Sequence, residues 1–594
     1  MSKQSLVLLS LLLLVFPLLA ACGAQPAPPA EGGAAGGEQT PIVSGATDAQ
    51  ATEPTGDTVE LTQAPAGATG DQPQAGGSFR YGRGGDSVAL DPVNVTDGES
   101  LKVTRQIFDS LLAYKPGTTE LVPALAVEVP EPTNGGRTYT FKLREGVKFH
   151  DGTDFNAEAV VFNFDRWRDS KNPYHKGGGG NSENFAYYTA QFGGFDNDSI
   201  ITKVEATGPY EVQFTLKRPQ APFLSNIAMG AFGIASPAAV QKNVEQFWQN
   251  PVGTGPFKLV RWNQGSTVEL EKYADWWGAN LPTEEGGSGP YLDQVTFQSI
   301  PDNTGRTAAL VGGQLSAADG LTPDDVPTIK AKPNLQVLER PAMNVGYLAM
   351  NNQKKPFDNP KVRQAVVHAI NMPQIVQAFF GDTADVASNP MPPSIPYFNK
   401  SIQPYKYDPE LSKRLLSEGG MPDGFTTDLW YMPVPRPYMP NGKGLAEAMQ
   451  SDLAKVGIKV TLVTREWGTY LQEVGSSKHS MALLGWTGDN GDPDNFLNVL
   501  LSSHTATPED ANNIAYYKNP EVDKLLQTGQ STTDAAERRQ AYYRAQEIIH
   551  EDVPWVPIAY ARPPTGAMKT VQGYTLSPTG GEPFNSVYFS EGGR

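Results

Sequence analysis

The residues best suited to bind a small charged molecule lie at 485–496, in the sequence GWTGDNGDPDNF. The apolar run before them, 481–484, is typical of a buried strand that is bounded by turn residues. Glycines let a backbone approach a ligand closely, an indole such as that of Trp486 covers an apolar face, and a carboxylate accepts hydrogen bonds from a cation. We therefore expect Asp489 to bind a positively charged group of a ligand.

The same stretch also fits a second interpretation, an acidic surface turn in front of a helix that begins near Phe496. In such a turn Asp492 or Asp494 would cap the helix by accepting a backbone N–H. We expect this cap from Asp494. Asp489 lies too early in the chain to cap that helix, which favours the ligand role for it.

A residue of opposite charge, Arg436, lies in the loop PVPRPY at 433–438. Its three prolines stiffen the loop, so that the arginine is presented to a ligand at a small cost in conformational entropy. The loop follows an alternating segment, 427–432, which predicts a strand. After the loop, apolar residues at spacing four predict a helix over 443–456, and a β-branched run predicts a strand over 458–464.

Strand, helix and strand over this length predict a βαβ unit with parallel strands. Another helix-like stretch, 467–474, leads into the strand at 481–484. Loops that follow parallel strands open at the same edge of a sheet, where open α/β sheets bind ligands. Arg436 and Asp489 are therefore expected to face one cleft. The alternative is an ion pair between them that serves the structure alone.

The length and charge of the chain exclude several classes of protein. Its 594 residues are enough for two or more lobes. The net charge of −17 argues against nucleic acid as a partner and against a basic membrane-binding surface. The six histidines are scattered without a metal-binding spacing, and we expect no metal site and no cofactor.

The N-terminus is typical of an exported protein. Lys3 and the apolar run 6–19 predict a secretory signal over 1–21. The apolar run is short for a segment that spans a membrane. Leu-Ala-Ala-Cys at 19–22 resembles the bacterial lipobox, and Cys22 is the only cysteine of the chain. We expect Cys22 to be lipidated. Residues 22–77, rich in Ala, Gly, Pro, Thr and Gln, then form a disordered tether that cannot bury a core.

Several later segments resemble one family, the extracytoplasmic solute-binding proteins of peptide-type ABC importers, family 5. The segments that carry the resemblance are 121–167, 251–257 (PVGTGPF), 344–348 (NVGYL) and 360–365 (PKVRQA). Two further segments, 432–441 and 485–496, are most similar to the dipeptide-binding subgroup. The resemblance covers nearly everything after residue 78.

The resemblance implies a two-lobed α/β fold with two hinge crossovers and an extra domain on the first lobe. Lobe one is expected from 78–110, 252–340 and 562–594, the extra domain from 111–251, and lobe two from 341–561. It also implies a monomeric, lipid-anchored protein, on the extracytoplasmic face of the membrane or in the periplasm. Such a protein would capture dipeptides and deliver them to an ABC permease.

In the dipeptide-binding subgroup, residues at matching positions contact the ligand. By this resemblance Asp489 holds the ammonium of the ligand and Arg436 holds its carboxylate. The neighbouring contact positions are matched by Pro437, Tyr438, Trp486, Thr487 and Gly488. An N-terminal loop is expected to add Val95 and Thr96, although this chain departs from the subgroup there.

Other functions stand as alternatives to dipeptide binding. Within binding proteins, the alternatives are a longer oligopeptide or a chelated metal as the ligand. The alternative outside binding proteins is a secreted peptidase or hydrolase. The chain has no G-x-S-x-G elbow, and the glycines at 177–180 are not followed by the Lys-Ser/Thr of a phosphate loop. The sequence therefore favours a binding protein over an enzyme.

Overall fold

A computed structural model describes residues 73–176, 185–282, 286–508 and 511–591. The predicted signal over 1–21, Cys22 and nearly all of the predicted tether lie outside the described residues. The folded region begins slightly before residue 78, its predicted start, since Gly76 N–H donates to Tyr291 O at 2.8 Å and Asp293 N–H donates to Gly77 O at 3.0 Å.

The first large sheet has seven strands in the order β11-β18-β10-β1-β9-β8-β7. β1 runs parallel to both of its neighbours, whereas the other pairs are antiparallel. The strands come from three separate regions of the chain: β1 (Ser78–Arg83), β7 (Phe257–Asn263), β8 (Thr267–Lys272), β9 (Gln294–Ser299), β10 (Ala317–Ala318), β11 (Leu335–Glu339) and β18 (Pro564–Met568). The helices beside this sheet are α1 (Gly98–Ile107), α6 (Asn303–Val311) and α7 (Asp325–Lys330), and β19 (Val571–Gln572) pairs with β20 (Tyr588–Phe589). α5 (Pro237–Lys242) lies next to α2 (Ala157–Arg168) instead.

The second large sheet has six strands in the order β13-β17-β12-β16-β14-β15. It consists of β12 (Asn344–Met350), β13 (Ala384–Val386), β14 (Thr426–Trp430), β15 (Lys459–Val463), β16 (Met481–Thr487) and β17 (Trp555–Ala561). Its helices are α8 (Pro360–Ala369), α9 (Met372–Phe380), α10 (Pro409–Glu418), α11 (Gly442–Ala454), α12 (Trp467–Gly475), α13 (Asp494–Leu501), α14 (Pro520–Ser531) and α15 (Ala535–Asp552). β12 and β17 are buried at every position, which places them at the centre of this core.

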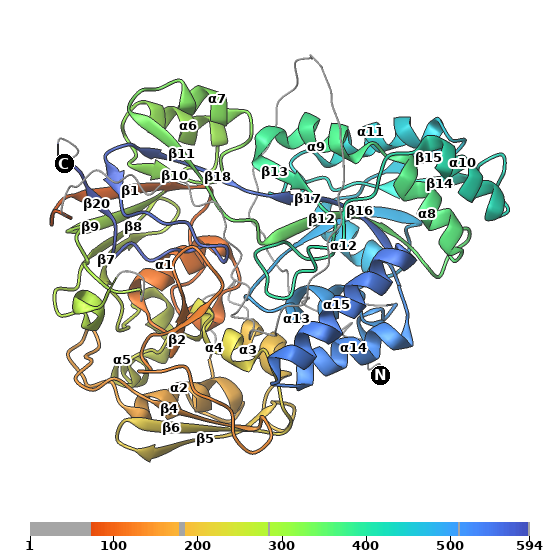
Figure 1. The fold of residues 1–594 in the computed structure, drawn as a ribbon. Helices are drawn as coiled ribbons and strands as arrows, with labels where there is room; N and C mark the ends of the chain where they lie inside the picture. The colour runs from red at the N-terminus through yellow and green to blue at the C-terminus, as the bar shows by residue number, and fades with distance from the viewer. Residues whose placement is uncertain (1–72, 177–184, 283–285, 509–510, 592–594) are drawn as a thin grey trace, which may run out of the picture.

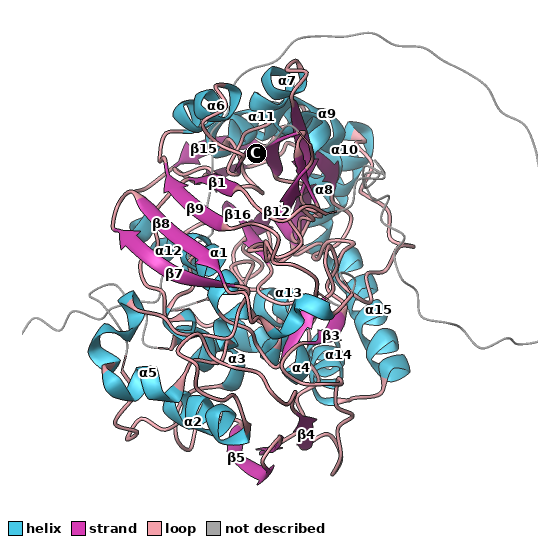
Figure 2. Cartoon of the chain, turned by 90° about the vertical axis from the view of Figure 1, so that its left-hand side faces the viewer, coloured by secondary structure: helices cyan, strands magenta, loops and turns pink. Residues whose placement is uncertain are grey.

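A smaller three-stranded sheet, β4-β6-β5, lies below the first large sheet in both views (Figures 1 and 2). Its elements are β4 (Thr138–Lys142), β5 (Ile201–Gly208), β6 (Glu211–Leu216) and α2 (Ala157–Arg168), with α3 (Ala186–Phe192), α4 (Phe223–Ile227) and the hairpin of β2 (Leu112–Tyr114) and β3 (Leu121–Pro123) nearby. Phe164 on α2 packs edge-on against Phe214 of β6, with ring centroids 4.7 Å apart. The sheet therefore has an aromatic core of its own.

The chain passes between the two large sheets twice, once from β11 to β12 and once from β17 to β18. The two passages lie side by side, because Arg340 N–H on the first donates to Pro563 O on the second at 3.1 Å. This arrangement confirms the expected two-lobed α/β fold with two crossovers.

The βαβ prediction around the candidate site is confirmed. β14 pairs in parallel with both β15 and β16, and α11 buries Leu445, Met449 and Leu453. β16 is longer than predicted and continues through Trp486 to Thr487, because these residues pair with Val345 and Asn344 of β12.

A distant turn of the chain sets the end of α1, which lies at Ile107. The Ile107 carbonyl accepts a hydrogen bond from Gly255 N–H at 2.9 Å, and a side-chain carbon on Gly255 would lie 2.6 Å from Gln106 O. The turn at 251–257 therefore packs directly on the end of α1. Asn156 caps the start of α2, since its Oδ1 accepts from Ala159 N–H at 3.0 Å.

Candidate functional site

A cavity of about 820 Å³ lies between the two large sheets. The second lobe contributes the end of β16, the loop after β14 and several residues of α12. The first lobe contributes α1 and the segment 319–323, and both passages between the lobes reach the wall. The two lobes thus share one binding space.

The loop that carries Arg436 is held on the second sheet by Tyr438. The loop closes on itself, since Arg436 and Met439 exchange backbone hydrogen bonds at 3.0 and 2.9 Å. Tyr438 is buried and lies over Gly346 and Gly485, which are directly paired across β12 and β16. A methyl group at Gly485 would lie within 2.6 Å of three ring atoms of Tyr438. The two glycines therefore leave the space that the loop needs.

Arg436 extends from this loop into the cavity and stacks on Trp467 of α12, with its guanidinium carbon 5.1 Å from the ring centroid. Its Nε atom is buried and has no hydrogen-bond partner among the described residues. A guanidinium offers donors in a planar fork that matches a carboxylate. Arg436 is thus a cation on the cavity wall that no carboxylate of the described residues neutralises.

Asp489 lies just beyond β16, and two neutral residues orient its carboxylate. Tyr187 Oη donates to Oδ1 at 3.0 Å, and Asn495 Nδ2 donates to Oδ2 at 3.1 Å. Asn495 Oδ1 in turn accepts from the Asp489 backbone N–H at 2.9 Å and from Trp486 Nε1 at 3.1 Å. Burial raises the pKa of Asp489, and these two side-chain hydrogen bonds oppose the rise. A ligand ammonium at this place would lower the pKa again by favouring the charged form.

The alternative of a structural ion pair between Arg436 and Asp489 is wrong. In the described ranges of the chain neither residue has an ion-pair partner, and both line the same cavity. In the described part of the chain, no charged residue is paired with either side chain.

Most of the other residues predicted for the site lie on this cavity, and one does not. The lining includes Thr96, Pro437, Tyr438, Trp486, Thr487 and Gly488. Val95 is only 1% exposed and does not line the cavity. Asp97, two residues later, caps α1 by accepting from Ser100 N–H at 2.8 Å. The cavity lining therefore gives no support to a ligand contact from Val95, which stays a prediction.

The prediction that Asp494 caps a helix near Phe496 is also wrong. α13 begins at Asp494 itself, after Pro493 at the cap position. Asp492 instead accepts from the Asp494 backbone N–H at 3.0 Å and forms a two-pronged ion pair with Arg538 at 2.9 and 2.8 Å. Asp492 thus has a structural role that fixes the end of the binding loop.

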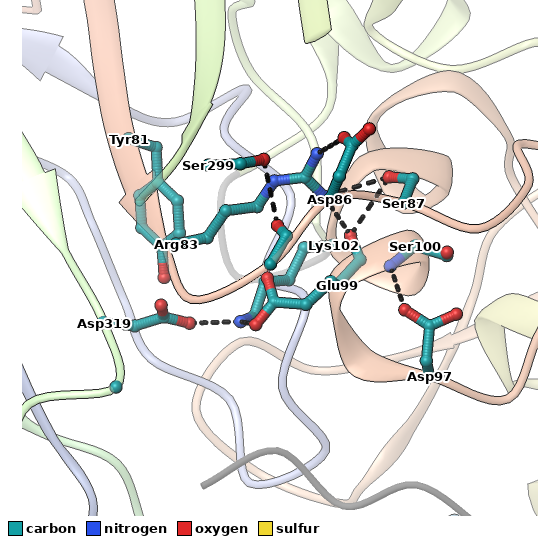
Figure 3. A network of polar contacts seen from close by, with 12 residues as sticks. Tyr81, Arg83, Asp86, Ser87, Asp97, Glu99, Ser100, Lys102, Ser299 and Asp319 are labelled. Atoms are coloured by element: carbon teal, nitrogen blue, oxygen red, sulfur yellow. Dashed lines mark hydrogen bonds and ion pairs between the residues drawn. The ribbon is translucent and has the colours of Figure 1, made fainter. Parts of the chain in front are cut away.

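Sequence reasoning missed the wall that the first lobe contributes. Lys102 on α1 pairs with Glu99 at 3.1 Å and also with Asp319, as Figure 3 shows. Arg105 lies one further turn along the same helix and lines the cavity as well. The signal in the sequence was the spacing of charged residues by three, at 99, 102 and 105, which places them along one side of a helix. Tyr187 carried no local signal.

Two other features are absent from the described residues. They contain no group of three or more His, Cys, Asp or Glu side chains that could hold a metal ion. None of the helices in the described ranges is long and apolar enough to cross a membrane.

Comparisons with known proteins agree on one family. The family model of the bacterial extracellular solute-binding proteins, family 5, matches residues 120–508. The dipeptide-binding protein of Escherichia coli (strain K12) is 37% identical over 515 residues, which cover 85% of this chain and 93% of that protein. Heme-binding protein A of Haemophilus influenzae is 35% identical over 522 residues, which cover 86% of this chain and 92% of that protein.

A solved structure extends the likeness to the fold. The ABC transporter-associated periplasmic binding protein of Helicobacter pylori, in complex with the peptide STSA, superposes with a TM-score of 0.70 at 36% identity. The match covers 87% of this chain and 99% of that one. Members of this family bind solutes and are not enzymes. The chain therefore belongs to family 5 of the bacterial extracellular solute-binding proteins.

Proposed function

We propose that this protein captures dipeptides outside the cytoplasm and delivers them to an ABC importer. The observation that carries the proposal is the pair of uncompensated opposite charges, Asp489 and Arg436, on the wall of one cavity between the lobes. Asp489 binds the ammonium group of the peptide and Arg436 binds its carboxylate. Trp486, Thr487 and Gly488 line the space between the two groups.

This arrangement selects for charge and length more than for side chains. The terminal charges of an extended dipeptide lie roughly 6 Å apart, since each residue spans about 3.3–3.6 Å. Each charge-assisted hydrogen bond contributes about 1.5–3 kcal/mol, so that a ligand lacking one terminal charge is penalised. The rest of the cavity can take varied side chains together with water.

The size of the cavity supports a second candidate ligand, a longer peptide. A volume of about 820 Å³ falls near the upper end of the 300–1,000 Å³ that small-molecule sites span. Similar proteins also bind different ligands, heme in one and the peptide STSA in another. Mass spectrometry of the ligand released from the purified protein distinguishes a dipeptide from a longer peptide.

Titration calorimetry tests the two assigned charges. Asp489→Asn keeps the shape of the side chain but loses the charge that would pair with the ligand ammonium. Loss of one partner of a buried pair costs about 3–5 kcal/mol, which corresponds to roughly a hundredfold to several thousandfold weaker binding. N-acetylation of the peptide should weaken binding to the unmodified protein in the same way. Amidation of the peptide carboxylate should matter much less in Arg436→Ala than in the unmodified protein.

Asp494→Asn is the matched control, because Asp494 belongs to the same loop region but does not line the cavity. It should bind dipeptides as the unmodified protein does. Near-native affinity in Asp489→Asn, or equally tight binding of free and N-acetylated dipeptides, would rule out the assignment of Asp489.

We also propose that Cys22 carries a lipid anchor and that the tether holds the binding lobes away from the membrane. The lipobox-like sequence and the single cysteine support the anchor. The division into lobe one, the extra domain and lobe two at 78–110, 111–251, 252–340, 341–561 and 562–594 remains a proposal, and the composition of the three sheets supports it.

A further inference from the structure

Arg105 is a cation on the first-lobe wall of the cavity that no carboxylate of the described residues neutralises. It lies in the last turn of α1, and its Nη1 donates to Gly580 O at 2.7 Å and to Thr579 Oγ1 at 3.1 Å. Its Nε is buried without a hydrogen-bond partner in the described ranges, and its Nη2 makes no bond to a described residue either. The Nε and Nη2 donors of this guanidinium are thus not used by the described residues.

The side chain is held in place rather than free to move. Its aliphatic part passes between Gly230 and Gly581, where a methyl group would collide with it: one at Gly230 would lie 2.7 Å from Cγ, and one at Gly581 would lie 2.9 Å from Cδ. Two glycines from distant regions of the chain therefore form a slot for the arginine. A cation held in this way presents its free donors in a fixed direction.

Three other cations on the cavity wall differ from Arg105 because carboxylates neutralise them. Lys102, one turn earlier on α1, is paired with Glu99 and Asp319 (Figure 3). Arg340 is paired with Glu582, and Arg562 is paired with Glu339 and Asp385. Burial lowers the pKa of Arg105, and the positive charge of Arg340 lowers it further. An arginine nonetheless stays protonated, so that a bound anion would relieve an unpaired charge.

Arg105 and Asp489 line the same cavity, and two tyrosines interact electrostatically with Arg105. The hydroxyl of Tyr187 donates to Asp489, and Tyr187 interacts electrostatically with Arg105. Tyr114 connects the same two charges: burial raises the pKa of its hydroxyl, Arg105 lowers it, and Asp489 raises it. A ligand whose ammonium binds Asp489 therefore brings the groups next to that ammonium toward Arg105.

We propose that Arg105 binds a second carboxylate of the ligand, located close to the free amino group. This inference rests on the proposed function, because Asp489 must hold the ammonium for the acid to reach Arg105. Two kinds of peptide have this chemistry: a peptide whose first side chain is acidic, and a γ-linked glutamyl peptide whose α-carboxylate is on the same carbon as the amine. The protein prefers either to its uncharged counterpart.

The test compares matched acid and amide ligands by titration calorimetry with the full-length protein. The first pair is Glu-Leu and Gln-Leu, and the second is γ-Glu-Leu and the same peptide with its α-carboxylate amidated. Three- and four-residue peptides with the same first residues repeat the comparison at other lengths. One charge-assisted interaction should make the acid bind about tenfold to a hundredfold tighter than its amide. The pair with the larger ratio identifies the source of the carboxylate.

In Arg105→Gln the ratio should fall to about one, while the amide ligands bind as before. Arg562→Gln removes a positive charge from the same cavity, but that charge is already paired, so the ratio should persist. If Arg105→Gln no longer binds the amide ligands, Arg105→Lys decides, because a lysine keeps the charge but lacks the planar fork. In Arg105→Lys the ratio of acid to amide binding must then be severalfold smaller than in the unmodified protein.

Three results would overturn the inference: equal binding of acid and amide by the unmodified protein, a ratio that survives in Arg105→Gln, or an unchanged ratio in Arg105→Lys. Failure of the proposed function gives a different result, because free and N-acetylated peptides would then bind equally well. A protein that binds none of these peptides refutes both.

Discussion

Gly485→Ala should displace the loop that carries Arg436 without touching any group that contacts the ligand by charge. A methyl group at this position would lie within 2.6 Å of three ring atoms of Tyr438, whereas ordinary contacts begin at 3.4 Å. The ring must therefore retreat by at least about 0.8 Å. Tyr438 is 4% exposed, and its backbone carbonyl lies over Gly346, so that the loop can move only away from the sheet.

The expected magnitudes follow from this displacement. Overpacking of a buried site costs about 1–3 kcal/mol of folding free energy. A shifted loop also misplaces Arg436, and loss of one charge-assisted hydrogen bond to the ligand carboxylate costs about 1.5–3 kcal/mol, or roughly a tenfold to hundredfold loss of affinity. Amidated dipeptides, which lack that carboxylate, should lose little affinity.

Denaturant unfolding and titration calorimetry measure the two effects. Gly208→Ala is the matched control, because a methyl group on this strand glycine would meet its nearest neighbour, Glu211 Cβ, at an ordinary 3.7 Å. In a Tyr438→Ala background the stability cost of Gly485→Ala should disappear, since the ring that it strikes is gone. Native stability and native affinity in Gly485→Ala, or a cost that persists without the Tyr438 ring, would refute this account of how the loop is held.

Three further predictions concern the binding loop and the N-terminus. Asp492→Asn should destabilise the fold by about 3–5 kcal/mol in denaturant unfolding, because it breaks a buried pair with Arg538. Peptide affinity should change little. An unperturbed unfolding midpoint would contradict this role. Burial and then the charge of Asp492 raise the pKa of Asp494 to about 7 from an ordinary 3.8. The protonated Asp494 side chain therefore contributes to the free energy of unfolding below pH 4, and this contribution is lost as the pH rises through 7. Asp494→Asn should therefore be the more stable protein at pH 8, by at most about 4 kcal/mol, and a stability difference that does not change between pH 4 and 8 would count against this. Cys22→Ser should move the protein from the membrane fraction to the soluble fraction, and retention in the membrane would argue against the anchor.

The sequence by itself determined those features of the site that depend on short-range patterns. The alternation of 427–432 and the helical spacing over 443–456 predict two parallel strands, and parallel strands place the residues after them at one edge. Arg436 and Asp489 could be placed on one cleft for that reason. The cap at Asn156 was equally predictable, because a cap depends on a bond to a residue three positions away.

Only the tertiary structure decided which charges remain unpaired. Tyr187 donates to Asp489 across a separation of 302 residues, and Arg105, from a still more distant part of the chain, lines the same cavity. Tyr438 fits over Gly346 and Gly485 only because β12 and β16 pair in one register, and α1 ends where a distant turn packs on it. Local patterns in a sequence fix helices and strands, whereas such contacts depend on how those elements pack, and packing is not encoded in any single segment.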